Sequence, residues 1–287
     1  MAKRLSARQR RALAPKPPLG VALSYAAVIR TWLTKLQTRI MSVVLADWES
    51  NPVVFGPGTL RSDASGFTRR KLAGIKLELE QSLDPKELDP QIAKFAKRVA
   101  NSGSKVSPAG VSSIQDKPGL PGGTLRRVIG ISSGDLGVKG ELDRFRERNV
   151  SLIRSLGEKQ LDDIEDLLSQ AESGAWRVEE LQGKIQERFG VSKSKANLLA
   201  RDQTLKLNGQ LTKVRQTNAG ITKYIWTTSH DERVRPAHAD LDGTECLWSS
   251  PPVVDDQGRT AHPGEDFQCR CVAFPILNEL DDEEGDE

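Results

Sequence analysis

The chain has little of the material from which secreted and membrane proteins are built. Its 287 residues include three cysteines, three histidines and only 5% aromatic residues. Three cysteines cannot all pair within one chain, which argues against a secreted protein held together by disulfides. No stretch approaches the roughly 20 apolar residues of a membrane span, and no apolar run of signal-peptide length follows the N-terminus. We therefore expect a chain that folds in a reducing cytoplasm.

Charge is distributed unevenly, although the net charge is only +3. Residues 1–16 hold six Lys or Arg and no acid, whereas residues 278–287 hold seven Asp or Glu and no base. Charge runs are most often disordered, solvated ends, and a basic one can also contact phosphates. We predict a disordered basic arm over residues 1–22 and an acidic tail over residues 278–287.

An amphipathic helix is predicted near residues 23–48, where apolar side chains recur at three- and four-residue steps. The pattern favours packing on its own domain, but the Pro-rich segment before it and the loop after it leave an intermolecular groove as the alternative. Two shorter helices are predicted near 67–82 and 90–101, the latter with Asp89 as N-cap, and Asp84-Pro85 is a similar start signal just before it. We assign residues 23–101 to a helical, partner-docking region.

Residues 102–140 are dense in Gly, Ser and Pro and lack clear periodicity. Such a stretch is a linker or a long loop ordered by a partner, and it sets the domain boundary. Within it, residues 125–129 (Leu-Arg-Arg-Val-Ile) suit a short linker strand, and their arginines could also meet nucleic acid.

Helical periodicity returns after residue 141. One long helix is predicted to end near Gly174, a second is predicted over 176–189 and stopped by Gly190, and a third over 193–219 is ended by Gly220. Three such helices form an antiparallel bundle or wrap a small sheet.

Two strands are predicted beyond the helices, because residues 221–227 alternate apolar and polar side chains and residues 271–276 are β-prone. The predicted fold class is α+β: a predominantly helical N-terminal region and a helix bundle that lead into a small C-terminal β-containing domain, with residues 141–277 as one domain.

The segment between these strands gathers the residues best suited to metal binding, His238, His262, Cys269 and Cys271. Zinc binds mixed imidazole and thiolate ligands and stabilises segments that are too small to bury a core. We therefore predict these four residues as candidate ligands of a zinc ion.

Other interpretations of this cluster remain open. His238 could hydrogen-bond the turn at residues 241–243, with the two cysteines as half-buried strand residues and Arg235 paired with Asp231, Asp240 or Asp242. A zinc hydrolase would instead need an open coordination position and a carboxylate beside His262, such as Glu265 or Asp266.

Several short motifs in this region occur in a characteristic order. They are Ala200-Arg201-Asp202-Gln203-Thr204, Tyr224-Ile225-Trp226-Thr227-Thr228, Asp231-Glu232-Arg233-Val234-Arg235-Pro236-Ala237-His238, Leu241-Asp242-Gly243, Pro251-Pro252, His262-Pro263-Gly264 and Cys269-Arg270-Cys271. In this order they resemble the C-terminal domain of the Mu F-like head-morphogenesis family, the minor head proteins of tailed bacteriophages. The resemblance covers roughly residues 150–277.

The resemblance implies a structural, non-enzymatic component of the virion head that is assembled in the host cytoplasm. It implies the portal protein and capsid or scaffold proteins as partners, a place in the procapsid interior, and a role in DNA packaging or ejection. The basic arm could contact packaged DNA. Relatives often carry Cys-x-x-Cys where this chain has residues 235–238, so Arg235 takes the place of a possible ligand.

Two rival functions come from different classes of protein. One is a metal-dependent nuclease or toxin-like effector, which would use the His/Cys cluster as a reaction centre. The other is a DNA-binding adaptor, which would use the basic arm and Arg126-Arg127 and whose duplex affinity would fall steeply with salt.

Overall fold

The computed structural model of the chain describes residues 17–50, 70, 73, 74, 77, 85–103, 136–174, 176–218 and 220–276. These ranges contain helices α2 (Leu19–Ser50), α4 (Pro85–Gly103), α7 (Leu136–Ser173), α8 (Val178–Asn218) and α9 (Pro236–Asp240). They also contain strands β1 (Lys223–Thr227), β2 (Glu245–Leu247) and β3 (Val272–Pro275). Helices followed by a small antiparallel sheet confirm the predicted α+β class.

The chain divides into two compact units. The sheet-bearing unit takes residues 1–23, 93–145 and 200–287, and the helical unit takes residues 24–92 and 146–199, each as far as it is described. None of the described helices has the length and apolar composition needed to cross a membrane.

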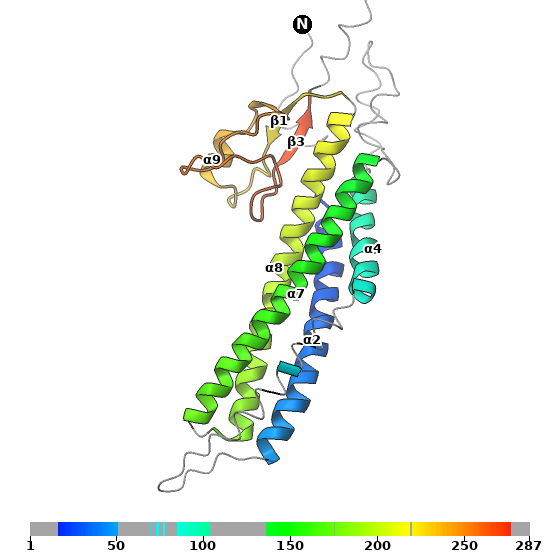
Figure 1. Cartoon of the computed structure of the whole chain (residues 1–287). Helices are drawn as coiled ribbons and strands as arrows, with labels where there is room; N and C mark the ends of the chain where they lie inside the picture. Colours follow the sequence, from blue (N-terminus) through cyan, green and yellow to red (C-terminus); the bar gives the residue numbers. More distant parts are fainter. Residues whose placement is uncertain are drawn as a thin grey trace, which may run out of the picture. The chain divides into compact units, whose positions relative to one another are not determined.

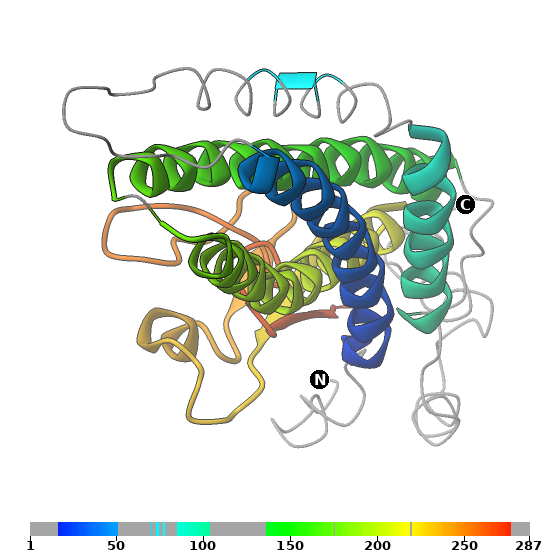
Figure 2. The ribbon, with the colours of Figure 1, turned by 90° about the horizontal axis from the view of Figure 1, so that it is seen from below.

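In the helical unit, the predicted apolar stripe of α2 is buried. Seven of its nine members are at most 5% exposed: Tyr25, Ile29, Leu33, Leu36, Ile40, Val44 and Trp48. The other two, Trp32 and Val43, are partly buried. The Tyr25 hydroxyl donates a 2.6 Å hydrogen bond to Asn149 of α7, and Arg30 donates a 2.7 Å bond to Asn197 of α8. α2 thus lies against both helices, which run antiparallel to each other (Figures 1 and 2). Its apolar face is used within its own unit, as the favoured interpretation predicted.

Helix α8 corrects the sequence prediction, because it runs without a break from Val178 to Asn218. Gly190 does not end a helix, and no new helix begins at residue 193. Ile185, Phe189 and Ala196 stay in one helical phase and are at most 1% exposed. Their burial outweighs the cost of a glycine in a helix interior, about 1 kcal/mol. The predicted end is correct, since Gly220 has a φ of 78° just beyond the helix.

Helix α4 also begins earlier than predicted, at Pro85, so Asp89 is not its N-cap and Pro90 lies inside it. Near a helix start, one lost backbone hydrogen bond is tolerated more readily than at its centre. Asp89 pairs instead with Arg146 of α7, at 2.5 Å. Both ends of the predicted linker are helical instead, because α4 extends to Gly103 and α7 begins at Leu136.

Several predictions lie partly or wholly outside the described residues. These are the helix near 67–82, of which residues 70, 73, 74 and 77 are helical, the strand at 125–129, the acidic tail and most of the basic arm. The arm was predicted to be disordered to residue 22, but residues 19–22 already belong to α2.

The sheet of the sheet-bearing unit has the order β2-β1-β3 and is antiparallel throughout. The predicted strands at 221–227 and 271–276 are observed as β1 and β3, and Trp226 pairs with Ala273 across them. β2 was not predicted, because three residues are too few to show alternation. Most of the chain between β1 and β3 is irregular (Figure 2).

The C-terminal part of α8 supports this sheet through polar contacts. Gln216 donates a 3.0 Å hydrogen bond to the Ala273 carbonyl and accepts a 3.0 Å bond from the Trp248 indole. Gly209 lies so close to the loop that an added Cβ would be 2.6 Å from the Pro263 carbonyl oxygen. The helix and the loops therefore fix each other's positions.

The same part of α8 contacts α4 and lies close to the beginning of α7, where a Cβ added at Gly137 would be 2.9 Å from the Val214 side chain. Arg215 is 4% exposed and donates a 2.7 Å hydrogen bond to the Ala100 carbonyl, near the end of α4. Phe95 of α4 and Phe145 of α7 stack with their ring centroids 5.7 Å apart. These helix segments complete the sheet-bearing unit.

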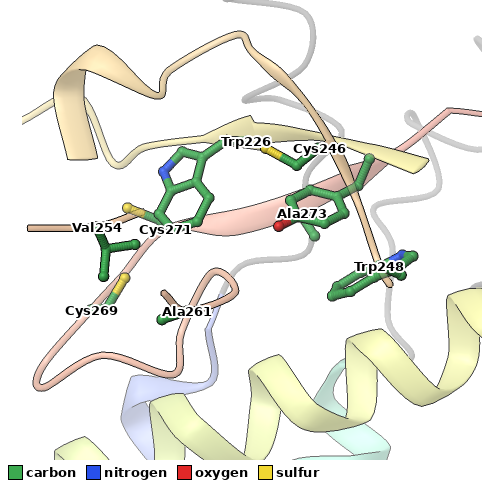
Figure 3. Packing of buried hydrophobic residues seen from close by; sticks show 9 residues of the cluster. Trp226, Cys246, Trp248, Val254, Ala261, Cys269, Cys271 and Ala273 are labelled. Carbon is green, nitrogen blue, oxygen red and sulfur yellow. The ribbon is translucent and has the colours of Figure 1, made fainter. Parts of the chain in front are cut away.

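A small core lies between the strands and the loops that connect them (Figure 3). Its members are Tyr224, Trp226, Cys246, Trp248, Val254, Ala261, Cys269, Cys271 and Ala273. Figure 3 shows the sulfurs of Cys269 and Cys271 on the Val254 side of the cluster and that of Cys246 elsewhere. All three cysteines are free thiols.

Candidate metal centre

Three of the four predicted ligands come together in space. Nδ1 of His238 lies 3.6 Å from Sγ of Cys269 and 3.6 Å from Sγ of Cys271. The three candidate donor atoms all lie within 4.8 Å of one another, and the side chains belong to residues that are 2%, 3% and 5% exposed, respectively. We call His238, Cys269 and Cys271 the His-Cys-Cys cluster.

Local backbone structure explains this convergence. Pro236 begins the one-turn helix α9, and Arg235 before it is extended, with φ −65° and ψ 147°. This brings His238 into the core beneath β1, where its ring meets Trp226 edge-on at a centroid distance of 5.4 Å. Cys269 and Cys271 are two residues apart at the entrance to β3, a spacing that directs both side chains to one side of an extended chain.

His262 lies outside the cluster. Its Nδ1 is 3.0 Å from the Tyr224 hydroxyl, its ring packs on Trp248 at 4.9 Å, and it is 3% exposed. The predicted set of four ligands thus becomes three residues in space, because the turn at Pro263 and Gly264 faces α8 while Cys269 and Cys271 face α9.

Burial lowers the pKa of His262, and the positive charge of Lys213 lowers it further. The folded chain therefore binds this proton less readily than the unfolded chain, whose histidine titrates near pH 6.5. Stability is fully present above about pH 6.5 and falls as the pH decreases through that value towards the folded-state pKa.

We predict that His262→Gln makes stability less dependent on pH between about pH 7.5 and pH 5.5. The measurement is urea unfolding of the wild type and the variant at both pH values, with the difference between them isolating His262. Equal losses of stability in the two proteins would contradict the assignment.

Asp266 is the neighbour that sequence reasoning misplaced. Its Oδ2 lies 3.3 Å from Nε2 of His238, outside good hydrogen-bond alignment but within ion-pair distance, whereas the sequence suggested a place beside His262. Arg235 and Arg259 hold the carboxylate at 2.9 and 2.7 Å. The alternative pairing of Arg235 with Asp231, Asp240 or Asp242 is therefore wrong. The contact of Asp266 with Arg235 and Arg259 could not be predicted, because no spacing rule connects either arginine to Asp266.

Asp266 is only 4% exposed, but its negative charge is compensated by neighbouring positive groups. Burial alone would raise its pKa, but hydrogen bonds from Arg259 and the Phe267 amide, together with the charge of Arg235, hold the pKa below its ordinary value. Asp266 therefore remains ionised at neutral pH and faces His238 with a negative charge.

The two cysteines share their protons unequally. A hydrogen bond from Cys271 and one from His238 outweigh burial and lower the pKa of Cys269 to about 5. The same bond to Cys269, together with burial, raises the pKa of Cys271. Cys269 is thus a thiolate at neutral pH and Cys271 its donor, a ready arrangement for a soft cation.

The burial of the cluster limits what it can do chemically. With each residue at most 5% exposed, a macromolecular substrate has no path to its donor atoms. The arrangement suits an ion held inside the fold better than a reaction centre.

Comparison with known proteins gives two matches. Residues 162–274 match the sequence model of a family described as "Phage Mu protein F like protein". A curated "Uncharacterized protein" of Haemophilus influenzae (strain ATCC 51907 / DSM 11121 / KW20 / Rd) is 38% identical over 130 residues. That alignment covers 45% of this chain and 28% of the relative, so the chain matches less than a third of the relative's length. No solved structure matches the chain significantly.

Proposed function

We propose that this protein is a minor head protein that acts in the head morphogenesis of a tailed bacteriophage, because residues 162–274 match the Phage Mu protein F-like family. The family match carries the proposal, because it spans the end of α7, all of α8 and most of the three strands. The predicted resemblance, over residues 150–277, covered the same segment.

A structural role is proposed in preference to an enzymatic one. The side chains best suited to catalysis in the described part of the chain, those of the His-Cys-Cys cluster, are buried. α8 and the sheet brace each other through Gln216, as expected of an anchoring domain. The protein would be present in the virion head and would be made in the host cytoplasm.

The proposed partners are the portal protein and capsid or scaffold proteins of the procapsid interior, with a part in DNA packaging or ejection. Because the apolar face of α2 is buried in the helical unit, docking would use the polar sides of the helices. The six cations of residues 1–16 would contact packaged DNA.

The deciding experiment is co-purification of the tagged full chain with the portal subunit of the same phage. We expect the chain to elute with the assembled portal ring and to be detected by mass spectrometry in purified heads. The portal subunit mixed with the affinity tag alone is the matched control for nonspecific retention. Absence from purified heads, together with no retention by the portal, would refute the proposal.

The DNA contact has a separate test. Binding to duplex DNA should weaken steeply with rising salt, because each neutralised phosphate releases counterions. A variant with all six cations of residues 1–16 replaced by glutamine should lose this binding while keeping the portal interaction. Loss of both together would contradict separate roles for the arm and the folded part.

A further inference from the structure

We propose that His238, Cys269 and Cys271 bind one zinc ion as an internal structural site, with Asp266 orienting the histidine. The inference is independent of the function proposed above, because it depends only on donor atoms that the fold brings together. Imidazole nitrogen and thiolate sulfur are the donors that zinc combines in structural sites.

The distances between donor atoms fit zinc. With Zn–S near 2.3 Å and Zn–N near 2.05 Å, a tetrahedral angle places sulfur and nitrogen about 3.6 Å apart. Both Nδ1–Sγ distances in the cluster are 3.6 Å. Each nitrogen–sulfur pair is therefore spaced as two ligands of one ion are, and the two sulfurs lie within 4.8 Å of each other.

Asp266 supplies the second contact that a ligating histidine usually makes. Zinc-bound imidazole commonly turns its other ring nitrogen to a carboxylate, which fixes the ring and makes it a better donor. Here Nδ1 faces the sulfurs and Nε2 lies 3.3 Å from Asp266, itself held by Arg235 and Arg259. Arg235 thus contributes to the site without being a ligand.

The ion would stabilise a segment that has little regular structure. Between β1 and β3 the chain contains only the one-turn helix α9 and the three-residue strand β2. A bond from α9 to the entrance of β3 would close that long connection, and binding would release the thiol proton of Cys271. The described residues supply three protein donors, and it is the burial of the cluster that sets this site apart from an open catalytic one.

The chain offers matched controls for a test by substitution. We expect the reduced, full-length protein to bind one zinc ion per chain by mass-spectrometric metal analysis, and His238→Ala, Cys269→Ala and Cys271→Ala to bind none. Cys246→Ala and His262→Gln change the same residue types within the same unit, outside the cluster, and should retain the ion. Asp266→Asn should weaken zinc binding by about 10- to 100-fold.

A second measurement needs no variant and so does not depend on the stability of a mutant. Cobalt(II) added to the wild type should give the absorption of a tetrahedral ion with thiolate-to-metal charge transfer, and zinc should displace it.

His238→Cys should keep the ion with three thiolates. The proposal is overturned if the reduced wild type shows neither thiolate-bound cobalt nor zinc, or if the Cys246 and His262 controls lose the ion while His238→Ala retains it.

Discussion

Replacing Trp226 by alanine is expected to cause the largest loss of stability of any single substitution in the sheet-bearing unit, about 3–5 kcal/mol. Trp226 is 0% exposed, lies on the central strand β1 and packs edge-on against His238. Alanine would leave a cavity between β1 and the loops, which have few other large side chains to fill it.

The effect is best measured by hydrogen exchange of the amides in β1 and β3, which reports opening of this unit alone. Protection should decrease by about two to three and a half orders of magnitude, at about 1.4 kcal/mol for each factor of ten. Phe267→Ala is the matched control, since Phe267 is an aromatic residue of the same unit and is 57% exposed. If both variants lose protection equally, Trp226 is not the centre of this core.

The second large effect is expected from Gly209→Ala. An added Cβ would be 2.6 Å from the Pro263 carbonyl oxygen and 3.4 Å from the Cα of Gly264. Because both contacts are with backbone, α8 and the loop must move apart, at a cost of about 1–3 kcal/mol. Protection of the loop amides from hydrogen exchange should fall accordingly.

Gly190→Ala is the control for this substitution. Gly190 lies inside the same helix, and an added Cβ there meets nothing within 4 Å. Alanine should therefore stabilise the helix by about 0.5–1 kcal/mol, measured as a higher midpoint of thermal unfolding. If Gly209→Ala also raised the midpoint, the close approach between α8 and the loop would be refuted.

Much of the fold could be predicted because burial and periodicity agree locally. The stripe from Tyr25 to Trp48 repeats at helical spacing and is buried as expected. The β-prone residues before and after the His/Cys segment became β1 and β3, and the left-handed Gly220 ends α8. In each case the local preference and the tertiary environment favour the same structure.

The failures come from positions where the two disagree. Gly190 has the local preference of a helix end, but burial of Phe189 and Ala196 on either side keeps the helix intact. Asp84-Pro85 and Asp89-Pro90 both carry a helix-start signal, and α4 begins at the earlier of the two, Pro85.

Prediction of the candidate site from the sequence was limited for a different reason. His262 and Asp266 are neighbours in sequence but face different partners, Tyr224 and His238, because the turn between them changes the direction of the chain. The Cys-x-Cys spacing was informative since it acts within one extended segment. The contacts of Asp266 with Arg235 and Arg259 depend on the folded loops, and no local pattern encodes them.

The hydrogen bond from Arg215 to the Ala100 carbonyl has a practical consequence for anyone expressing only the segment that matches the family. Family similarity begins at residue 162, yet this buried guanidinium takes its acceptor from α4, which lies far upstream of that limit. A fragment trimmed to residues 162–274 would retain the cation and lose its acceptor, together with the Phe95–Phe145 pair. The segment that matches the family is thus shorter than the set of residues that this unit needs in order to fold.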